Sequence, residues 1–393
     1  MYFILDKVLQ APHGGVILKL PGDENHTRPL DYMLGHFDDF TYRDFFHISR
    51  YKFLEKDKLK FIFNIVHMPE WVDIEISKEC VDLLHNDDNT FLCLMSVLEC
   101  RLSSLDLSNE CKRLNIPLHK VVVLCSDAPA HNQVLNGIKY ICINFWESIS
   151  RHHHQTLPDV STTVVDELDI DNASKKFLCL NRNIKPHRIW LMYSILRSNM
   201  LEHGHVSFNL PDVSPNEFDE TSKSHHTLKR IPEHLHKDYK MALQREMYNR
   251  RLDKLDKQYV INYNDSMKKY YNDSLLSVVT ESDSTKNFIT EKTYKAIMNL
   301  HPFFIVGNPD QHSLLRARGY ETFEDLFGVE SVMNYEQAMR MWKHLDSIDL
   351  PILKRNIKEK YLDKCIHNQR LLLTRKISWN DIKDSLSTTV GKA

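Results

Sequence analysis

Glycine is scarce in this 393-residue chain, which contains only 10 glycines. They form neither the G-x-G-x-x-G fingerprint of dinucleotide-binding proteins nor the G-x-x-x-x-G-K-[ST] phosphate loop. No stretch is of low complexity, and no apolar run approaches the ~18 residues that indicate a transmembrane helix. These absences weigh against dinucleotide and phosphate-loop chemistry, and they predict that no segment spans a membrane.

Paired cysteine motifs are also missing. The chain has eight cysteines, none in a C-x-x-C pair, and most lie in apolar runs such as "VVVLCSD" and "KFLCLN". A free cysteine in such a run acts as a small hydrophobic residue. The first ten residues, "MYFILDKVLQ", lack the basic start and small-residue cleavage site of a signal peptide and read as a strand. We therefore expect reduced core thiols and a cytoplasmic protein.

The composition is that of an ordinary globular protein. Hydrophobic residues make up 42% of the chain and charged residues 26%, and the formal net charge is −2. The whole molecule is therefore not a generic binder of polyanions. The length suffices for two domains with complete cores. Apolar strands alternate with helical patterns, which predicts parallel sheets covered by helices, an α/β fold class.

The same alternation suggests the domain boundaries. We predict an N-terminal α/β domain over residues 1–165, a second α/β domain over 166–345, and a helical tail over 346–393. The run "KYICINFWE" reads as a strand of the first domain, and "TFLCLMSVLEC" as either a strand or a buried helix. Residues 151–174 fit an interdomain linker, and 229–258 a long helix.

One stretch of the second domain has the pattern strand, polar loop, helix, strand. It runs from Ser277 to Gly307, "SVVTESDSTKNFITEKTYKAIMNLHPFFIVG". Thr290 is a good N-cap for the helix, and Pro302 ends the helical region. Two buried strands joined by one helix form a parallel βαβ unit. Ligands of open α/β sheets bind beyond the carboxyl ends of the strands, which here is the loop leading into this helix.

The start of this helix contains a glutamate and a lysine. A helix N-terminus offers free N–H groups and a positive dipole end, so it suits a phosphate. Lys292 beside that positive end is unfavourable unless an anion lies between them, and Glu291 could accept two ribose hydroxyls. One interpretation of this pattern is a nucleotide-diphosphate site. From these residues alone a solvated first turn with no function is favoured, since glutamate and lysine are common at helix starts.

Two segments carry a family resemblance. "TESDSTKNFITEKTYKAIMNLHPFFIVGNP", together with the upstream "KFLCLNRNIKPHRIWLMYSILRSNML", resembles the donor-binding region of fucosyltransferases and their bacterial and phage relatives. The resemblance spans about residues 175–325. It implies that Glu291 and Lys292 bind the nucleotide ribose and phosphates. It also implies that Asn181 and Arg188 line the same cleft, with Arg188 on the diphosphate.

The chain departs from this family at two places. Thr280-Glu281-Ser282 replaces the Phe-Glu-Asn of the family, and Asn287-Phe288 replaces its Asp-Tyr before "ITEK". The base and the sugar of the donor therefore stay open. In the resulting interpretation Glu281 faces the donor sugar or the ribose.

The resemblance implies two facing Rossmann-like domains, the GT-B architecture, with the last helix crossing back to the first domain. The implied activity is an inverting sugar transfer from a nucleotide-diphosphate sugar to an acceptor hydroxyl. Arg188 and Lys292 would stabilise the leaving charge, so no metal or other cofactor is expected. A general base must come from the first domain, where the candidates after strands are Glu70, Asp127 and, ranked behind them, His67. For each of the three, a capping or hydrogen-bonding role is the favoured alternative.

The acceptor is open between two kinds of molecule. The tail "ILKRNIKEKYLDKCIHNQRLLLTRK" is strongly basic, which suits duplex DNA, although a solvated helix face has the same pattern. We favour a phage enzyme that glycosylates hydroxymethylated pyrimidines in DNA. The alternatives are a fucosyltransferase-like enzyme acting on a cell-surface glycan and a non-catalytic nucleotide-binding module. The sequence leaves the oligomeric state open.

Two further polar clusters have simpler interpretations. His152, His153 and His154 are adjacent and lack a spaced partner motif, so an exposed loop is favoured over a metal site. Arg182 and Lys185 lie near a strand end where an anion would bind, but for both residues solvation of the loop is the favoured interpretation.

Overall fold

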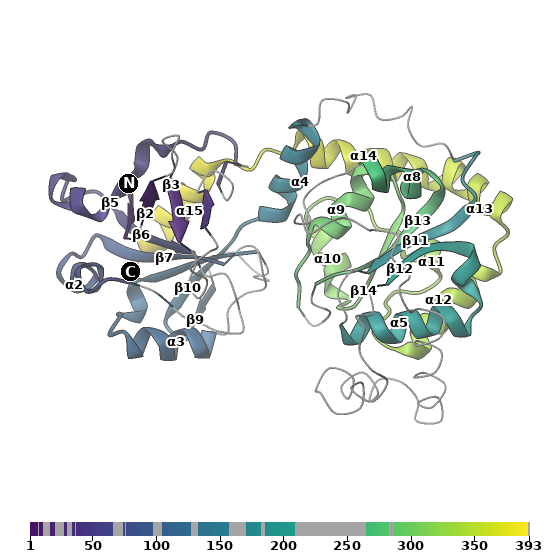
Figure 1. The fold of residues 1–393 in the computed structure, drawn as a ribbon, viewed down its shortest axis with the longest axis horizontal. Coiled ribbons are helices and arrows are strands. Elements are labelled where there is room, and N and C mark those ends of the chain that lie inside the picture. The colour runs from purple at the N-terminus through teal and green to yellow at the C-terminus, as the bar shows by residue number, and fades with distance from the viewer. Residues whose placement is uncertain are drawn as a thin grey trace. The chain divides into compact units, whose positions relative to one another are not determined.

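The computed structural model describes residues 1–393 except 7, 11–15, 20–26, 30–33, 36, 66–73, 75, 97–103, 127–132, 157–169, 182–184, 209–264, 283, 285 and 392–393. The chain divides into two compact units (Figure 1). Unit 1 comprises Met1–His152 and Lys376–Ala393, and unit 2 comprises His153–Arg375. Each unit contains its own parallel sheet, so the predicted fold class of two Rossmann-like α/β units is confirmed.

Unit 1 is built on a seven-stranded sheet in the order β5-β1-β6-β7-β8-β10-β9. Neighbouring strands are parallel except for the edge pair β10 and β9, which is antiparallel. The strands are β1 (Tyr2–Leu5), β5 (Phe45–His47), β6 (Lys60–Ile65), β7 (Thr90–Ser96), β8 (Val121–Cys125), β9 (Gln133–Leu135) and β10 (Ile138–Cys142). A separate antiparallel sheet contains β2 (Val8–Gln10), β3 (Val16–Lys19) and β4 (Thr27–Pro29).

Unit 1 also contains helices. They are α2 (Lys78–Asn86), α3 (Ser104–Arg113), the start of α4 (Phe145–Thr156) and α15 (Trp379–Val390), with short 3-10 turns η1 (Tyr42–Asp44), η2 (Ile48–Phe53) and η3 (Leu118–Lys120). Residues 90–96 of the run that read as strand or helix form strand β7, and every residue of β7 is buried. A central parallel strand is covered on both faces, which explains its continuous apolar sequence.

The last helix of the chain, α15, belongs to unit 1, so the predicted crossing back of the C-terminal helix is confirmed. Asp39, which has a left-handed backbone with φ of 59°, accepts hydrogen bonds from the Trp379 N–H and the Ser378 hydroxyl. Trp379 is fully buried and its ring packs against those of Phe3 and Phe45. Aromatic packing and helix capping together hold the returning segment.

Unit 2 has a four-stranded parallel sheet in the order β12-β11-β13-β14. Its strands are β11 (Lys175–Asn181), β12 (Gly204–Phe208), β13 (Ser274–Thr280) and β14 (Phe303–Val306). Its helices are α5 (Pro186–Arg197), η5 (Met200–His203), α8 (Asp265–Asn272), α9 (Glu291–Met298), α10 (Asp310–Ala317), α11 (Glu324–Phe327), α12 (Tyr335–Asp346), α13 (Leu350–Asn356), the π-helical turn η7 (Ile357–Tyr361) and α14 (Leu362–Thr374).

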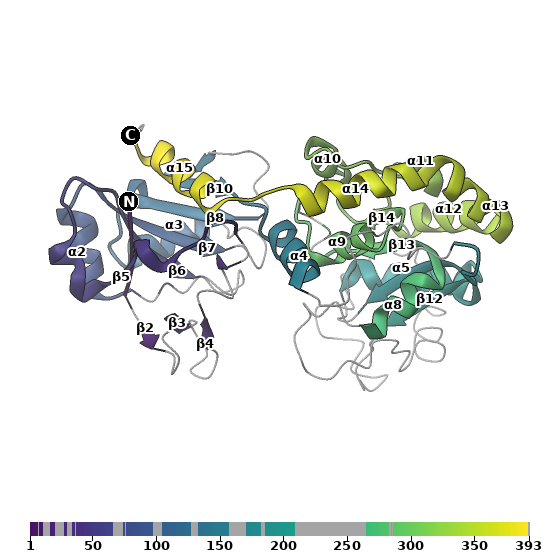
Figure 2. The ribbon, with the colours of Figure 1, turned by 90° about the horizontal axis from the view of Figure 1, so that it is seen from above.

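The helices of unit 2 cover its sheet from two sides. Helices α5 and α12 lie on one side, and α9 and α14 on the other (Figures 1 and 2). The α5–α12 contact includes stacked rings of Tyr193 and Tyr335 and a 2.8 Å hydrogen bond from the Trp342 indole to Ser194 Oγ. On the other side, the Gln369 amide donates to the Met298 carbonyl at 2.6 Å and ties α14 to the end of α9.

Two predictions about local structure are wrong. The strand predicted over "KYICINFWE" ends at Cys142, and Phe145 begins helix α4. The apolar run continues because residues 145–150 of α4 are buried, so sequence alone does not separate the two elements. His152, His153 and His154 were expected in a loop but continue α4 to Thr156. The predicted helix 229–258 lies outside the described residues.

The units divide the chain at other positions than the predicted domain boundaries. The change from unit 1 to unit 2 falls between His152 and His153, within α4. The predicted tail 346–393 is shared: its part up to Arg375 belongs to unit 2, and Lys376–Ala393 to unit 1.

Two features that the sequence analysis considered, the cysteines and the apolarity of the helices, can be checked in the described residues. Seven cysteines lie there as buried free thiols, and burial raises the pKa of Cys80 to about 12. Among the described helices, none has the length and apolarity needed to cross a bilayer.

We expect Trp379→Ala to destabilise unit 1 by about 3–5 kcal/mol, because it leaves a cavity among aromatic rings. Urea denaturation followed by circular dichroism measures this change. Phe53 is 86% exposed and serves as the control, since Phe53→Ala should change the free energy of unfolding by less than about 0.5 kcal/mol. Equal effects of the two substitutions would contradict the role of Trp379 as an anchor.

Candidate functional site at the switch point of the four-stranded sheet

The strand order of unit 2 reverses between β11 and β13. From β11 the chain runs through α5 to β12 on one side, and β13 and β14 follow on the other side. Open parallel sheets bind ligands beyond the carboxyl ends of the strands at such a reversal, because the flanking helices leave toward opposite faces. The strand ends at this point are Asn181 and Thr280.

Asn181 and Thr280 are joined directly across the reversal. The Thr280 hydroxyl donates to Asn181 Oδ1 at 2.5 Å, and both residues are about 1% exposed. The Asn181 amide nitrogen lies 3.3 Å from Cys179 Sγ. Asn181 therefore fixes the spacing of the two central strand ends with its side chain. The structure brings it to the predicted edge of the sheet.

Three basic side chains from the start of α5 reach the backbone that follows β13. Arg188 Nη2 donates to the carbonyls of Thr280 at 3.1 Å and Glu281 at 3.2 Å. His187 Nε2 lies 3.0 Å from the same Glu281 carbonyl, and Lys185 Nζ donates to the Ser282 carbonyl. Arg188 is 3% exposed. Burial lowers the pKa of its guanidinium, while the nearby Glu281 and Glu291 carboxylates act in the opposite direction.

Glu281 is fully buried, and its carboxylate points to the start of α9. Oε1 accepts from the Thr290 N–H at 3.1 Å and from the Thr293 hydroxyl at 2.6 Å. Oε2 accepts from the Thr290 hydroxyl at 2.5 Å. All three donors belong to the N-cap or the first turn of α9. The side chain that we predicted to face the donor sugar or ribose thus contacts the helix, and its contact with a donor stays a prediction.

Glu291 and Lys292 form an ion pair at the first turn of α9, with Lys292 Nζ 2.9 Å from Glu291 Oε1. Lys292 Nζ also lies 3.1 Å from both Ser282 Oγ and Thr290 Oγ1. The side chain of Lys292 is 28% exposed and that of Glu291 only 6%. Burial acts to raise the pKa of Glu291, but the charges of Lys292 and Lys295 outweigh it and hold this pKa below its usual value.

The loop between Glu281 and Thr290 is held at several further points. Gln311, which is fully buried, donates from Nε2 to the carbonyls of Lys286 at 3.2 Å and Phe288 at 2.9 Å. Gly307 has a φ of 145°, and a Cβ there would lie 3.1 Å from Ser284 Cα. Only glycine fits this close approach without displacing the loop.

Several contributors to this site were not identified from the sequence. Thr290 was predicted as an N-cap, but its hydroxyl also bonds Glu281 and Lys292. His187 and Gln311 were not singled out, since neither belongs to a recognisable local motif. The predicted general bases Glu70, Asp127 and His67 lie outside the described residues, as does Arg182.

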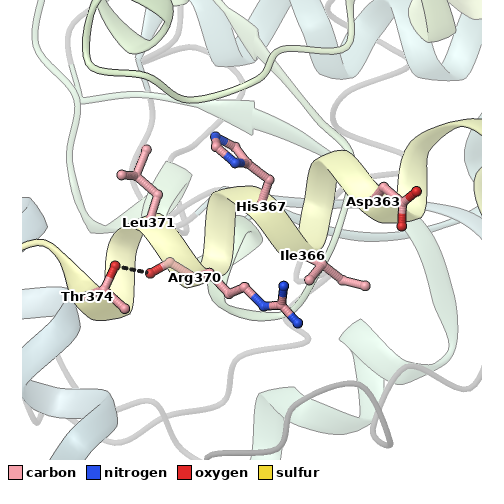
Figure 3. Close-up of a pocket in the computed structure, with 6 residues that line it drawn as sticks. All are labelled: Asp363, Ile366, His367, Arg370, Leu371 and Thr374. Atoms are coloured by element: carbon pink, nitrogen blue, oxygen red, sulfur yellow. Dashed lines mark hydrogen bonds between the residues drawn. The ribbon is translucent and has the colours of Figure 1, made fainter.

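Metal ligands and cavities were also sought elsewhere in the described residues, and neither contributes to this site. The described residues contain no group of three or more His, Cys, Asp or Glu side chains that could hold a metal ion. A hollow of about 470 Å³ lies along one face of α14 (Figure 3). Its lining residues are Asp363, Ile366, His367, Arg370, Leu371 and Thr374. None of them belongs to the site at the switch point.

The comparisons with known proteins point to one group of solved structures. No protein-family profile matches the sequence, and no curated protein matches it. The chain is similar to trehalose-6-phosphate synthase OtsA, at 10% identity over 88% of this chain and 74% of that one, with a TM-score of 0.42. Similar values hold for the UDP-forming α,α-trehalose-phosphate synthase of Burkholderia vietnamiensis, at 10% identity, 87% and 74% coverage and a TM-score of 0.41.

A third solved structure belongs to the same group. It is the α,α-trehalose-6-phosphate synthase of Burkholderia multivorans, at 12% identity, 88% and 73% coverage and a TM-score of 0.40. These three are not fucosyltransferases.

We expect Lys292→Ala to raise the pKa of Glu291, because burial then acts with less opposition from a neighbouring positive charge. NMR titration of the Glu291 carboxyl carbon measures the shift. Lys343, an exposed lysine in the last turn of α12, supplies the control Lys343→Ala, which should leave this pKa unchanged.

The lowered pKa of Glu291 also predicts how the stability of the protein changes with pH. A carboxyl whose folded pKa is depressed contributes stability above its unfolded pKa, about 4.3, and loses it as pH falls through the folded value. Glu291→Gln should therefore flatten the fall in stability below about pH 4.3. If the stability of Glu291→Gln falls at acid pH as steeply as that of the unchanged protein, the ion pair between Glu291 and Lys292 is contradicted.

Proposed function

We propose that the chain is a glycosyltransferase that moves a sugar from a nucleotide-diphosphate sugar to an acceptor hydroxyl. The observation that carries this proposal is the meeting of Asn181, Arg188 and the Glu291–Lys292 pair at the switch point of the unit 2 sheet. These residues come from three separate segments. Their position is the one where α/β sheets bind nucleotides.

Lys292 is the residue that we assign to the diphosphate. Its ammonium is partly exposed and held by three oxygen atoms, so it is ordered before any ligand arrives. Phosphate oxygens can join or replace these partners at little cost in side-chain entropy. Glu291, an acceptor-only carboxylate beside it, is assigned to the ribose hydroxyls. The family resemblance supports both roles.

Arg188 acts from a buried position. It keeps the role predicted for it, positive charge near the diphosphate, while its Nη2 donates to the carbonyls of Thr280 and Glu281. Its charge lies in a low-dielectric environment, where it is screened weakly. Asn181 lines the same edge of the sheet.

The proposed reaction requires no metal ion or other cofactor. The acceptor oxygen attacks the anomeric carbon, the bond from that carbon to the phosphate oxygen breaks, and the nucleoside diphosphate leaves with its negative charge. Lys292 and Arg188 stabilise that charge. A base removes the acceptor proton, and Glu70 and Asp127 stay our candidates. A single displacement inverts the anomeric centre.

For the acceptor we propose duplex DNA with hydroxymethylated pyrimidines, as expected of a phage enzyme in the host cytoplasm. Support comes from the helices after α12, where Arg355, Lys360 and Arg370 are all exposed. Lys358 is partly compensated by an ion pair with Asp171. Exposed cations along one run of helices suit a phosphate backbone. A cell-surface glycan is the alternative acceptor.

Calorimetry against the common nucleoside diphosphates tests the donor site. We expect one of them to bind, and Lys292→Ala to weaken that binding about tenfold or more, since a hydrogen bond to a charged group contributes about 1.5–3 kcal/mol. Lys343→Ala should bind as the unchanged protein does. Unaltered affinity in Lys292→Ala would contradict the assignment.

Incubation with a panel of nucleotide sugars then separates an enzyme from a binding module. Release of nucleoside diphosphate supports transfer or hydrolysis, and binding without release favours the non-catalytic module. The anomeric configuration of the released sugar, read by NMR, distinguishes inversion from retention.

A gel shift with duplex DNA tests the acceptor. We expect binding that weakens with salt. The slope of this salt dependence should be smaller in the triple variant Arg355→Ala, Lys360→Ala, Arg370→Ala, by about 0.9 for each phosphate that the variant no longer neutralises. The triple variant Lys52→Ala, Lys56→Ala, Lys58→Ala removes equal charge from exposed positions of unit 1 and is the control. No shift at low salt would favour the glycan acceptor.

A further inference from the structure

The carboxylate of Glu281 has the contacts of an anion bound at a helix N-terminus. Its two oxygens accept one backbone N–H and two hydroxyls, at 3.1, 2.6 and 2.5 Å, and all of them come from Thr290 and Thr293. The residue has no exposed surface. A buried carboxylate is tolerated only when hydrogen bonds and nearby positive charge compensate it.

The surroundings supply that positive charge. The carboxylate lies at the positive end of the α9 dipole, and Arg188 is close enough for Glu281 to act on its pKa. Lys292 Nζ contacts the same Thr290 hydroxyl that donates to Glu281. A lysine beside a positive helix end therefore has an anion for a neighbour within the protein itself.

We propose that Glu281 is a resident anion: it fills the anion position at the N-terminus of α9 and acts as a positioning residue for Glu291 and Lys292. The part of this inference that concerns a ligand rests on the proposed function. A diphosphate then meets the exposed side of the Lys292 ammonium, because Glu281 already takes the Thr290 N–H and hydroxyl.

The positioning follows from the connectivity. Glu281 directly follows β13, and Thr290 is the N-cap of α9. The Glu281 carboxylate joins the two ends of the loop between them. The Thr290 hydroxyl then accepts from the Lys292 N–H at 3.5 Å and from Lys292 Nζ at 3.1 Å. Removing the carboxylate takes away the partner that orients this hydroxyl, and with it the fixed position of the lysine.

Chemical rescue by formate tests the proposal. Glu281→Ala removes the carboxylate and leaves space that a formate ion can occupy with the same three donors. We expect formate to raise the melting temperature of this variant in a dose-dependent way, and to have no such effect on the unchanged protein. Chloride at equal ionic strength is the salt control, and Thr293→Val, which removes one donor and no charge, is the control variant.

Ligand affinity distinguishes a positioning role of Glu281 from a purely structural one, since a purely structural role would leave the affinity of the folded variant unchanged. In Glu281→Ala the affinity for the bound nucleoside diphosphate should fall about tenfold, and formate should restore it to within about threefold of the unchanged protein. Loss of affinity that formate leaves unrestored, or formate stabilising all variants equally, would overturn the proposal.

A second variant covers the case in which Glu281→Ala does not fold. Glu281→Gln keeps one acceptor oxygen but removes the charge, so exchange of the Thr290 amide hydrogen should quicken about tenfold or more. If the Thr290 amide hydrogen of this variant exchanges at an unchanged rate, the proposal that Glu281 is a resident anion is also overturned. If the unchanged protein binds no nucleoside diphosphate, the proposed function fails, whereas rescue of the melting temperature still tests the anion.

Discussion

The buried carboxylate of Glu281 is the interaction on which the geometry of unit 2 depends. It joins the carboxyl end of β13 to the N-terminus of α9, and it does so at the point where the sheet reverses direction. Because the group is charged and inaccessible to water, its hydrogen bonds must all be satisfied within the protein. That requirement selects threonines at the helix start and fixes the pair of charged residues that follows.

The same device recurs elsewhere in the chain. In unit 1, Asp6 follows β1 and accepts from the Ser77 N–H at the start of α2. Asp39 accepts from the Trp379 N–H at the start of α15. In each case a carboxylate beyond the local sequence caps a helix whose own N-cap is a serine or threonine. These three helix starts are thus stabilised both by a neighbour in sequence and by a more distant acid.

Much of the fold follows from local sequence, whereas the site does so only in part. Strands β11, β13 and β14 and the Thr290 cap of α9 were predictable from apolar runs and a polar N-cap residue, since both signals are local. The direction of the Glu281 side chain was not predictable, because it depends on how the loop from Glu281 to Thr290 folds back to bring the two residues together. The end of β10 was missed since α4 continues the apolar run. Lys292 beside a positive helix end was interpreted as the sign of a bound phosphate, which stays a prediction. The structure places the Glu281 carboxylate at the same helix start, and sequence spacing did not identify it.

The placement of α15 has a consequence for the order of assembly during synthesis. Unit 2 ends at Arg375, but unit 1 needs residues 376–393, which leave the ribosome later. Trp379 fills the aromatic cluster around Phe3 and Phe45, so the N-terminal unit stays incomplete until after the unit that follows it has been made. Domains usually fold in the order of translation. Here residues 1–152 can complete their unit only after the last helix has been made.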